Sequence, residues 1–321
     1  MVLGHAESAV LAFDVGGTDV KAGLVDPSGN VLGMRRVPTP LDPLNPGEAV
    51  LDRLAGLADE LASEFPDIPA KAAGVIVPGI VDSVGGIGIY SANLGWRNFP
   101  FTAEAEKRLG LPVAFDHDVR SAAAVEHAFG GSKEFNDVVV MVVGTGIAAA
   151  VFSGGVPVTA GGFAGELGHA QVPDPDAGAE PTGTEATRTE ATGAAILEAV
   201  GSAGAIAKRY SRKSGNTVDG ARDVLLRSQK GDAVAARVWA DAVDALAFTI
   251  CQCVNIIGTE AVVIGGGLAE AGEDLLEPLR ARVDQILDFQ RRPRLIQAQL
   301  GQDAGLLGAA LNARALLDGA R

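Results

Sequence analysis

Residues 14–18 read Asp-Val-Gly-Gly-Thr and lie between two apolar stretches. Residues 9–13 and 20–25 have the patterns of β-strands, which places the two glycines at the tip of a tight hairpin. Glycine lets backbone N–H groups come close to a phosphate, because it has no side chain. The acidic residue at position 14 would hold water around a magnesium ion, since this hard cation prefers oxygen ligands. Taken alone, the motif also fits an ordinary hairpin.

A second glycine-tipped hairpin is predicted at residues 144–146, which read Gly-Thr-Gly. Apolar runs at 137–143 and 147–152 flank it, and a Ser-Gly-Gly turn at 153–155 leads to a short strand. The order strand, glycine turn, strand, turn, strand thus occurs twice in the chain. It predicts two halves of similar architecture, although the sequence match between them is too weak to define a repeat.

Acidic residues also stand at the end of a predicted strand. Residues 112–115 form a short apolar run, which Asp116-His117-Asp118 and a helical pattern at 121–129 follow. A carboxylate placed after a buried strand and before a helix fits a catalytic loop end in an α/β domain. The alternative for Asp118 is a surface residue stabilised by the dipole of the helix N-terminus. Arg120 is a candidate for an ion pair with Asp116, without a role in chemistry.

Composition limits the classes of function. A chain of 321 residues exceeds the usual size of one core, so two domains are expected. The formal charge of −14 argues against a nucleic-acid surface, which needs clustered Lys and Arg. Cys251 and Cys253, the only two cysteines, lie in an apolar helical pattern and are expected to be buried thiols in a reducing compartment.

Neither a leader nor a membrane span is expected. The first residues lack the basic and apolar parts of a signal peptide. The longest apolar run, 138–152, is broken by glycines and is too short to cross a bilayer. The chain is therefore predicted to be soluble and cytoplasmic, without membrane or nucleic-acid partners.

Hydrophobic periodicity places further elements between the motifs. Residues 173–193 are rich in Pro, Thr, Glu and Ala and are predicted to form a mobile surface loop. Residues 91–101 are also predicted to be a loop. Helices are predicted at 48–65, 102–109, 121–129, 196–210, 232–257, 273–281 and 305–317. Buried strands are predicted at 72–77, 112–115 and 261–264, and a last strand at 294–298.

Seven motifs together resemble the ROK family, which groups bacterial sugar kinases with sugar-responsive repressors. The combination is specific, although no single motif is, and it covers essentially the whole chain. The motifs follow one another in the family's order: Asp14-x-Gly-Gly-Thr, Pro78-Gly79-x-Val-Asp, Asn93-Leu-Gly-Trp96, Asp118 before an alanine-rich helix, Gly144-Thr-Gly146, Gly165-Glu-Leu-Gly-His169 and Gly265-Gly-Gly267.

The resemblance implies an α/β chain with the two-lobed actin/hexokinase-like (ribonuclease H-like) fold. The smaller lobe is expected to comprise residues 1–121, joined by a C-terminal helix at 303–321. The larger lobe is expected to comprise residues 122–302. Relatives are commonly dimers or tetramers, so a homodimer is expected.

The resemblance also implies ATP-dependent phosphorylation of a hexose with Mg²⁺, and glucose phosphorylated at O6 is the first choice. N-acetylglucosamine and N-acetylmannosamine are the alternative substrates, and polyphosphate is an alternative donor. A non-enzymatic sugar-sensing regulator is disfavoured. Its helix-turn-helix domain of about 60–80 residues would have no room before Asp14.

The family's site residues transfer to this chain one by one. Asp118 matches the catalytic base, and Asp116 is the next candidate. Sugar-binding positions fall on Asn93, His117, Asp118, Glu166, His169 and Glu198. Positions that bind ATP and its phosphates fall on Asp14, Gly16, Gly17, Thr18, Lys21, Gly144, Thr145, Gly146, Gly265, Gly266 and Gly267, with Asp14 holding Mg²⁺ through water. A Rossmann turn is the alternative for the last three glycines, but it lacks the downstream acid of that fingerprint.

One departure from the family lies around the base. Many members have Asn-Asp-Ala-Asn where this chain has His117-Asp118-Val119-Arg120, so both asparagines are replaced.

The second departure concerns zinc. Many members carry a cysteine cluster that binds zinc together with the histidine that His169 matches. In this chain the three cysteine positions fall on Thr189, Ala191 and Ile196, which cannot bind zinc as thiolates do, so no structural zinc is expected. The same alignment makes Glu198 the second sugar-binding glutamate, with Glu190 as the alternative.

Overall fold

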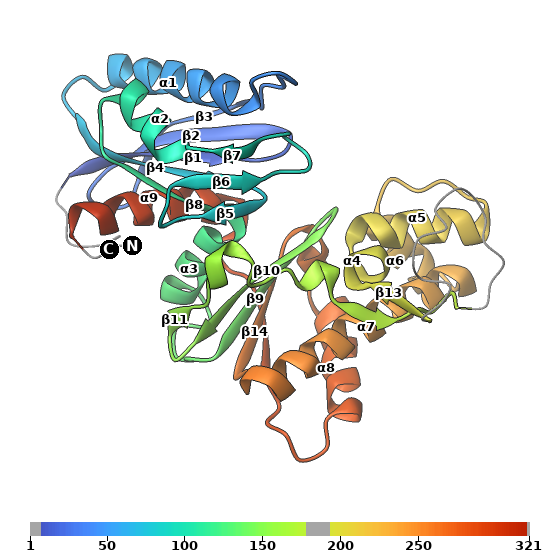
Figure 1. Cartoon of the computed structure of the whole chain (residues 1–321). Helices are drawn as coiled ribbons and strands as arrows, with labels where there is room; N and C mark the ends of the chain where they lie inside the picture. Colours follow the sequence, from blue (N-terminus) through green and yellow to red (C-terminus); the bar gives the residue numbers. More distant parts are fainter. Residues whose placement is uncertain (1–7, 178–192, 320–321) are drawn as a thin grey trace. The chain divides into compact units, whose positions relative to one another are not determined.

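The computed structural model describes residues 8–177 and 193–319. They divide into two compact units (Figure 1). The first comprises the chain up to Gly130, residues Thr159–Ala164 and the chain from Gln302 on, and the second comprises Gly131–Val158 and Gly165–Gly301. The lobe boundary expected between residues 121 and 122 falls inside helix α3 (Asp118–Phe129) of the first unit. This difference arises because α3 packs along the C-terminal helix α9 (Ala304–Leu317).

A five-stranded sheet forms the centre of the first unit, with the strand order β3-β2-β1-β4-β8. β1 pairs antiparallel with β2 and parallel with β4, while β2 pairs antiparallel with β3 and β4 pairs parallel with β8. The elements are β1 (Ala9–Val15), β2 (Asp19–Val25), β3 (Val31–Pro38), α1 (Pro46–Glu64), β4 (Ala70–Val77), α2 (Phe101–Leu109) and β8 (Val113–His117).

Helices cover both faces of this sheet. Leu11 and Phe13 of β1 belong to the buried cluster that includes α1 and α2, whereas Val10 and Ala12 belong to the cluster with α9. Successive side chains of a strand point to opposite faces, so α1 and α2 lie on one side and α9 on the other (Figure 1). A strand buried on both faces explains the continuous apolar run before Asp14.

Two glycines let α9 approach its neighbours closely. A Cβ atom on Gly74 in β4 would lie 1.9 Å from the carbonyl oxygen of Ala309. One on Gly308 would lie 2.5 Å from the backbone of Ser121 in α3. Because the obstacles are backbone atoms, neither position can accept a larger residue without a shift of the helix. The start of α3, where Asp118 lies, is thereby fixed against α9.

The second unit contains a sheet with the order β11-β10-β9-β14-β15. β9 pairs antiparallel with β10 and parallel with β14, β10 pairs antiparallel with β11, and β14 pairs parallel with β15. The strands are β9 (Val138–Val143), β10 (Ile147–Ser153), β11 (Val156–Pro157), β14 (Ala261–Gly265) and β15 (Arg294–Gln297). Each unit thus has three antiparallel strands in sequence followed by two parallel ones, which confirms the predicted repetition of architecture.

The core of the second unit is built around helix α7 (Ala233–Ile257). Asp232 caps it by accepting the N–H groups of Val234 and Ala235, and Gly258 ends it with a φ of 67°. Cys251 and Cys253 are buried free thiols, as predicted, and burial raises the pKa of Cys253 to about 11. Among the described helices, α7 alone is long and apolar enough to cross a membrane, but 61% of its apolar window is buried in the protein, as in a core helix.

Several elements differ from the sequence predictions. The helical pattern at 196–210 is two helices, because Ser202 caps the second by accepting the Ala205 N–H at 3.0 Å. Residues 91–101, predicted as a loop, contain a short strand, and residues 221–229, not predicted, form a helix. The loop predicted at 173–193 lies largely outside the described residues. The remaining elements are β5 (Ile80–Asp82), β6 (Ile87–Tyr90), β7 (Arg97–Phe99), β12 (Gln171–Pro173), β13 (Ala194–Ile196), α4 (Leu197–Gly201), α5 (Ala203–Ser214), α6 (Ala221–Gln229) and α8 (Glu273–Ile286).

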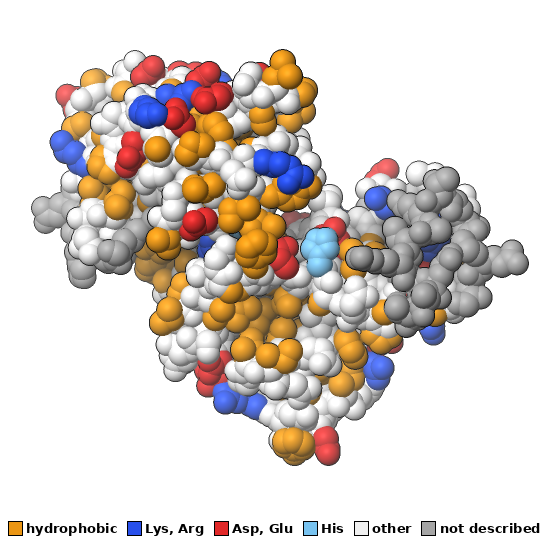
Figure 2. Space-filling view, in the orientation of Figure 1, with side chains coloured by type: hydrophobic (Ala, Val, Ile, Leu, Met, Phe, Trp, Pro, Cys, Tyr) orange, Lys and Arg blue, Asp and Glu red, His pale blue; other side chains and the backbone are white. Residues whose placement is uncertain are grey.

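Acidic residues outnumber basic residues in this chain. The chain has 40 Asp and Glu residues against 26 Lys and Arg residues. On the face drawn in Figure 2, acidic and basic side chains are interspersed on both units. The described residues on this face therefore do not form the continuous basic surface that nucleic-acid binding requires.

Candidate active site

The first glycine turn (residues 16–18) connects β1 to β2, as predicted. The Gly16 N–H donates to the Asp19 carbonyl at 2.8 Å, and a Cβ atom on Gly16 would lie 2.9 Å from that oxygen. Thr39 holds the turn from the end of β3. Its hydroxyl donates to the Gly16 carbonyl at 2.7 Å, and its N–H donates to the Thr18 carbonyl at 2.8 Å. Gly17 and Thr18 are exposed, so the turn is anchored at its base and open at its tip.

Asp14 lies just before this turn, beside Lys21. Lys21 Nζ is 3.7 Å from Asp14 Oδ2 and donates to the Gln302 carbonyl at 2.6 Å. Burial raises the pKa of Asp14 to about 6, while the Lys21 charge lowers that pKa and the Asp118 charge raises it. A Cβ atom on Gly305 would lie 2.5 Å from Asp14 Oδ2, so glycine makes room for the carboxylate. Negative charge in this environment is incompletely compensated, which favours an added cation.

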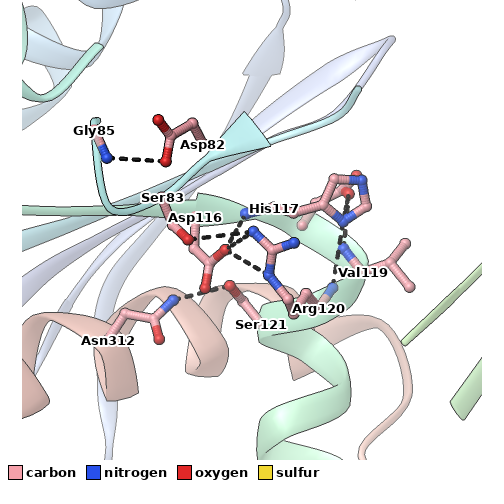
Figure 3. A network of polar contacts seen from close by, with 10 residues as sticks. Asp82, Ser83, Gly85, Asp116, His117, Val119, Arg120, Ser121 and Asn312 are labelled. Atoms are coloured by element: carbon pink, nitrogen blue, oxygen red, sulfur yellow. Dashed lines mark hydrogen bonds and ion pairs between the residues drawn. The ribbon is translucent and has the colours of Figure 1, made fainter. Parts of the chain in front are cut away.

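Asp116 is held in an ion pair with Arg120, as predicted. Arg120 Nε donates to Asp116 Oδ1 at 2.8 Å, and the His117 N–H donates to the same oxygen at 2.7 Å. Arg120 is only 7% exposed, and its guanidinium points toward Asp116 and Ser83 (Figure 3). The buried guanidinium thus occupies this carboxylate and gives it a structural role, which disfavours Asp116 as the base.

Asp118 is the first residue of α3, which begins three residues earlier than predicted. His117 caps the helix in place of Ser121, because its Nδ1 accepts the Arg120 N–H at 3.4 Å. The same Nδ1 lies 3.3 Å from Asp118 Oδ1, which also accepts the Val119 N–H at 2.7 Å. Within residues 8–177 and 193–319, both of these contacts use Oδ1, so Oδ2 of this partly exposed carboxylate can accept a proton.

Asn93 is exposed on a separate turn of the first unit. The Ser91 hydroxyl oxygen accepts the Leu94 N–H at 3.3 Å within this turn. The buried Trp96 anchors the turn in the core, with its ring centroid 4.9 Å from that of Phe101. The buried residues therefore fix the backbone while the Asn93 side chain faces solvent.

The second glycine turn (residues 144–146) connects β9 to β10, again as predicted. The Gly144 N–H donates to the Gly146 carbonyl at 2.9 Å, and Thr145 is exposed. The N-terminus of α5 packs against it: the Ala203 N–H donates to the Gly144 carbonyl at 2.8 Å, and a Cβ atom on Gly204 would lie 2.8 Å from the Thr145 carbonyl oxygen. This turn is therefore anchored by a helix.

Glu166, His169 and Glu198 lie in one region of the second unit. The His169 N–H donates to the Glu166 carbonyl at 3.0 Å across a short 3-10 turn, and both side chains are exposed. A Cβ atom on Gly168, between them, would lie 2.2 Å from the Ile147 carbonyl oxygen and 3.4 Å from Glu198 Oε2. The close packing at Gly168 brings this turn to the half-buried Glu198 carboxylate.

The third glycine group, residues 265–267, begins with the last residue of the buried strand β14. Gly266 has a φ of 80°, and a Cβ atom there would lie 2.5 Å from the Val143 carbonyl oxygen, so the chain passes close to the end of β9. A cavity of about 360 Å³ opens beside Gly267. It is lined by Ala221, Arg222, Leu225, Leu226, Gln229, Trp239, Gly267, Leu268, Glu270, Ala271 and Asp274.

Comparison with known proteins gives the family. The sequence pattern of the ROK family matches residues 10–315. The chain belongs to the ROK family. It is 31% identical over 327 residues to the glucokinase of Streptomyces coelicolor, and the alignment covers 95% of this chain and 97% of that protein. It is 32% identical over 310 residues to the N-acetylmannosamine kinase of Escherichia fergusonii, covering 95% of this chain and 98% of that protein.

A solved structure supports the fold of this ROK chain. The crystal structure of a ROK hexokinase from Thermus thermophilus matches with a TM-score of 0.78 at 30% identity, over 97% of this chain and 99% of that chain. The expected α/β fold of the actin/hexokinase-like, two-lobed class is confirmed.

Of the three positions of this chain that align with the family's zinc-binding cysteines, the structure describes one. Ile196 ends β13 and pairs with Gln171, so an apolar side chain stands where a cysteine ligand would be. Thr189, Ala191 and Glu190 lie outside the described residues. Among the residues that the structure does describe, no group of three or more His, Cys, Asp or Glu residues is arranged to hold a metal ion.

Sequence reasoning missed the residues that support these motifs. Thr39 fastens the first glycine turn from 23 positions away in the chain. Helix α6 lines the cavity beside Gly267, but its nine residues are too polar and too few to give a clear periodic signal. The prolines on both sides of Thr39 were the only local signal there, and they indicate a loop rather than a contact.

Proposed function

We propose that this ROK-family sugar kinase transfers the γ-phosphoryl group of ATP to the 6-hydroxyl of glucose, with Asp118 as the general base. The observation that carries the proposal is the state of two neighbouring carboxylates. Asp116 is neutralised by the buried Arg120, whereas Asp118 keeps Oδ2 available at the start of α3. One of the pair is structural and the other can accept the proton of the attacking hydroxyl.

The first glycine turn and Asp14 would serve the phosphates and their metal ion. Magnesium, when bound, supplies positive charge that offsets the charge of the triphosphate. The site fits that ion chemically, since Asp14 offers oxygen ligands. Burial, together with the nearby Asp118 charge, raises the pKa of Asp14 to about 6. Lys21 is held toward Asp14 by the Gln302 carbonyl and is placed to contact a phosphate oxygen.

The second unit would contribute both to the nucleotide and to the sugar. The exposed tip of the second glycine turn offers backbone N–H groups to phosphate, and the cavity beside Gly267 would take the base and ribose. Its volume of about 360 Å³ lies in the range of small-molecule sites, about 300–1,000 Å³. Glu166, His169 and Glu198 of the second unit are proposed to bind sugar hydroxyls. In the first unit, Asn93 and His117 are the proposed sugar ligands.

N-acetylmannosamine is the second candidate substrate. The relatives named for that activity are 32% identical to this chain, as close as the glucokinases at 31–32%. Identity values this similar do not decide between the two sugars. N-acetylglucosamine belongs to the same comparison.

A sugar panel tests the proposal directly. The protein is incubated with ATP and MgCl₂, and sugar-dependent ADP release is measured with glucose, mannose, N-acetylglucosamine and N-acetylmannosamine, with polyphosphate as an alternative donor. We expect the highest kcat/KM with glucose and ATP. The product should carry its phosphate at O6. Turnover confined to N-acetylmannosamine would identify that sugar as the substrate in place of glucose. The absence of sugar-dependent ADP release with all four sugars would overturn the assignment as a sugar kinase.

We extend the proposal to a cytoplasmic homodimer. Two large apolar side chains of the second unit support self-association: Ile256 is 79% exposed and Phe289 is 90% exposed. The segments that carry them are joined by a hydrogen bond from Gln290 Nε2 to Asn255 Oδ1 at 2.9 Å. Light scattering coupled to size-exclusion chromatography measures the mass, and a monomer at micromolar concentration would contradict the dimer.

A further inference from the structure

The Glu198 carboxylate touches two segments that the proposed function assigns to different substrates. Its Oε2 accepts the N–H of Ile147, the first residue after the second glycine turn, at 2.8 Å. A Cβ atom on Gly146 would lie 2.5 Å from that same Oε2. On its other side, Oε2 is 3.4 Å from the Cβ position of Gly168, between the sugar-binding candidates Glu166 and His169. Glycine on both sides leaves space for one carboxylate.

The helices around Glu198 are also tied to the turn. Glu198 lies in the first turn of α4, and the next helix, α5, donates the Ala203 N–H to the Gly144 carbonyl at 2.8 Å. The second glycine turn is therefore held at both ends, by the Glu198 side chain after Gly146 and by the α5 backbone at Gly144. A hydrogen bond from an N–H to a carboxylate is stronger than one between neutral groups, so Glu198 supplies the stronger of these two contacts.

We propose that Glu198 is a positioning residue for the phosphate-binding turn as well as a ligand of the sugar. Oε2 fixes the turn through Ile147, and in this proposal Oε1 accepts a hydrogen bond from a sugar hydroxyl. Sugar binding would then order the Glu198 carboxylate, which also holds the second glycine turn. As a result, the sugar and the nucleotide each strengthen the binding of the other. The inference rests on the proposed function for the identity of the two ligands.

Three variants separate this role from simpler ones. Glu198→Ala removes the acceptor of the Ile147 N–H, whereas Glu198→Gln keeps an acceptor oxygen and loses only the charge. The matched control is Glu260→Ala. Glu260 Oε2 accepts the N–H groups of Asn136 and Asp137 at 2.8 and 3.2 Å, so it performs the same task just before β9, at the end of that strand away from the second glycine turn.

The first measurement is the affinity for the magnesium complex of AMP-PNP, a non-hydrolysable ATP analogue, without sugar, by titration calorimetry. We expect Glu198→Ala to bind about tenfold more weakly than the wild type, because the lost contact is a charge-assisted hydrogen bond. Glu198→Gln should stay within about threefold of the wild type, and Glu260→Ala should bind like the wild type. A residue that only contacts sugar, or only stabilises the fold, does not give this order. Equal affinity of Glu198→Ala and the wild type would overturn the inference.

The second measurement repeats the titrations with saturating glucose. The wild type should bind AMP-PNP about fivefold more tightly or better, and Glu198→Ala should gain less than about twofold, which includes the case in which it no longer binds sugar. An undiminished gain in Glu198→Ala contradicts the inference.

Hydrogen exchange keeps the inference testable apart from the proposed function. Amides of residues 144–149 should exchange faster in Glu198→Ala than in the wild type or in Glu198→Gln, while Glu260→Ala should affect only the amides around residue 136. If wild-type protein binds no nucleotide, the proposed function fails while this prediction stands. If protection of the turn does not depend on Glu198, the positioning role fails even when the protein proves to be a glucokinase.

Discussion

Arg209 Nη2 donates to Asp241 Oδ2 at 2.8 Å, and the two side chains are only 5% and 4% exposed. The same guanidinium nitrogen lies 3.2 Å from Asp176 Oδ1, three residues after β12. The ion pairs therefore join α5 and α7 to the segment that follows His169. In zinc-binding members of the family, this part of the chain is expected to be held by metal. In this chain, the ion pairs of Arg209 with Asp176 and Asp241 connect that part to α5 and α7.

Breaking the buried pair should destabilise the protein strongly. Asp241→Asn leaves a buried guanidinium with Asp176 as its remaining partner, and removal of one member of a buried pair costs about 3 kcal/mol or more. Arg237→Ala is the matched control, because Arg237 pairs with the same Asp241 at 2.9 Å but is 74% exposed. It should cost less than about 1 kcal/mol. Urea unfolding followed by circular dichroism compares the two, and equal losses would contradict a buried network.

The acid stability of the protein should depend on Asp176. Burial alone would raise its pKa, but hydrogen bonds and charges from Arg209 and Lys213 lower it from 3.8 to about 2. A carboxyl group whose pKa is depressed on folding stabilises the folded state above its unfolded pKa, and this contribution is lost as the pH falls through the folded value. The free energy of unfolding of the wild type should therefore exceed that of Asp176→Asn at pH 5, with the difference shrinking between pH 4 and 2. A difference independent of pH over that range would assign the effect to packing instead.

Local sequence patterns were sufficient for the elements that carry the site. Gly16 and Gly146 were placed at hairpin tips because apolar strands flank them, and the structure has both turns there. The Asp116–Arg120 pair was also predicted, from opposite charges four positions apart, although Asp116 lies in β8 and Arg120 in α3. The start of α3 was not predictable, because Asp116, His117, Asp118 and Ser121 all offer capping groups and only tertiary packing selects one.

Contacts between distant residues had no local signal. Glu198 and Ile147 are 51 positions apart, and Arg209 and Asp241 are 32 apart. Their side-chain types are common on protein surfaces, so the sequence gives no reason to pair them. The sugar-binding assignment of Glu198 came from the family resemblance alone, and its contact with the second glycine turn could be found only in the folded chain.

Replacing the proposed base should stop turnover without unfolding the protein. Asp118→Asn keeps the shape of the side chain but cannot accept a proton, and loss of a positioned base costs about 10²–10⁴-fold in kcat. Sugar affinity and the melting temperature should change little, since the carboxylate is partly exposed. Asp116→Asn is the contrasting variant: it leaves the buried Arg120 poorly paired, so it should lower stability more than Asp118→Asn does. A near-normal kcat in Asp118→Asn would move the base elsewhere.

The last prediction concerns zinc. Ile196 occupies one of the three cysteine positions in the described part of the chain, and the sequence has Thr189 and Ala191 at the other two. The hydroxyl of Thr189 and the aliphatic side chains of Ala191 and Ile196 cannot replace thiolate ligands, and Arg209 with Asp176 already holds the adjoining segment. We therefore expect less than stoichiometric zinc, and activity and thermal stability that do not depend on it.

Metal analysis of protein purified without a metal-affinity tag measures the zinc content. Activity is then compared, with MgCl₂ in excess, before and after treatment with a zinc chelator, and again after zinc is added back. Unchanged kcat and melting temperature are expected, because the charges of Asp176, Arg209 and Asp241 remain in place when metal is removed. Asp241→Asn supplies the positive control for loss of that support: its melting temperature should fall with or without the chelator. One zinc ion per chain, or activity that the chelator abolishes and zinc restores, would show that residues outside the three cysteine positions of the family hold the metal.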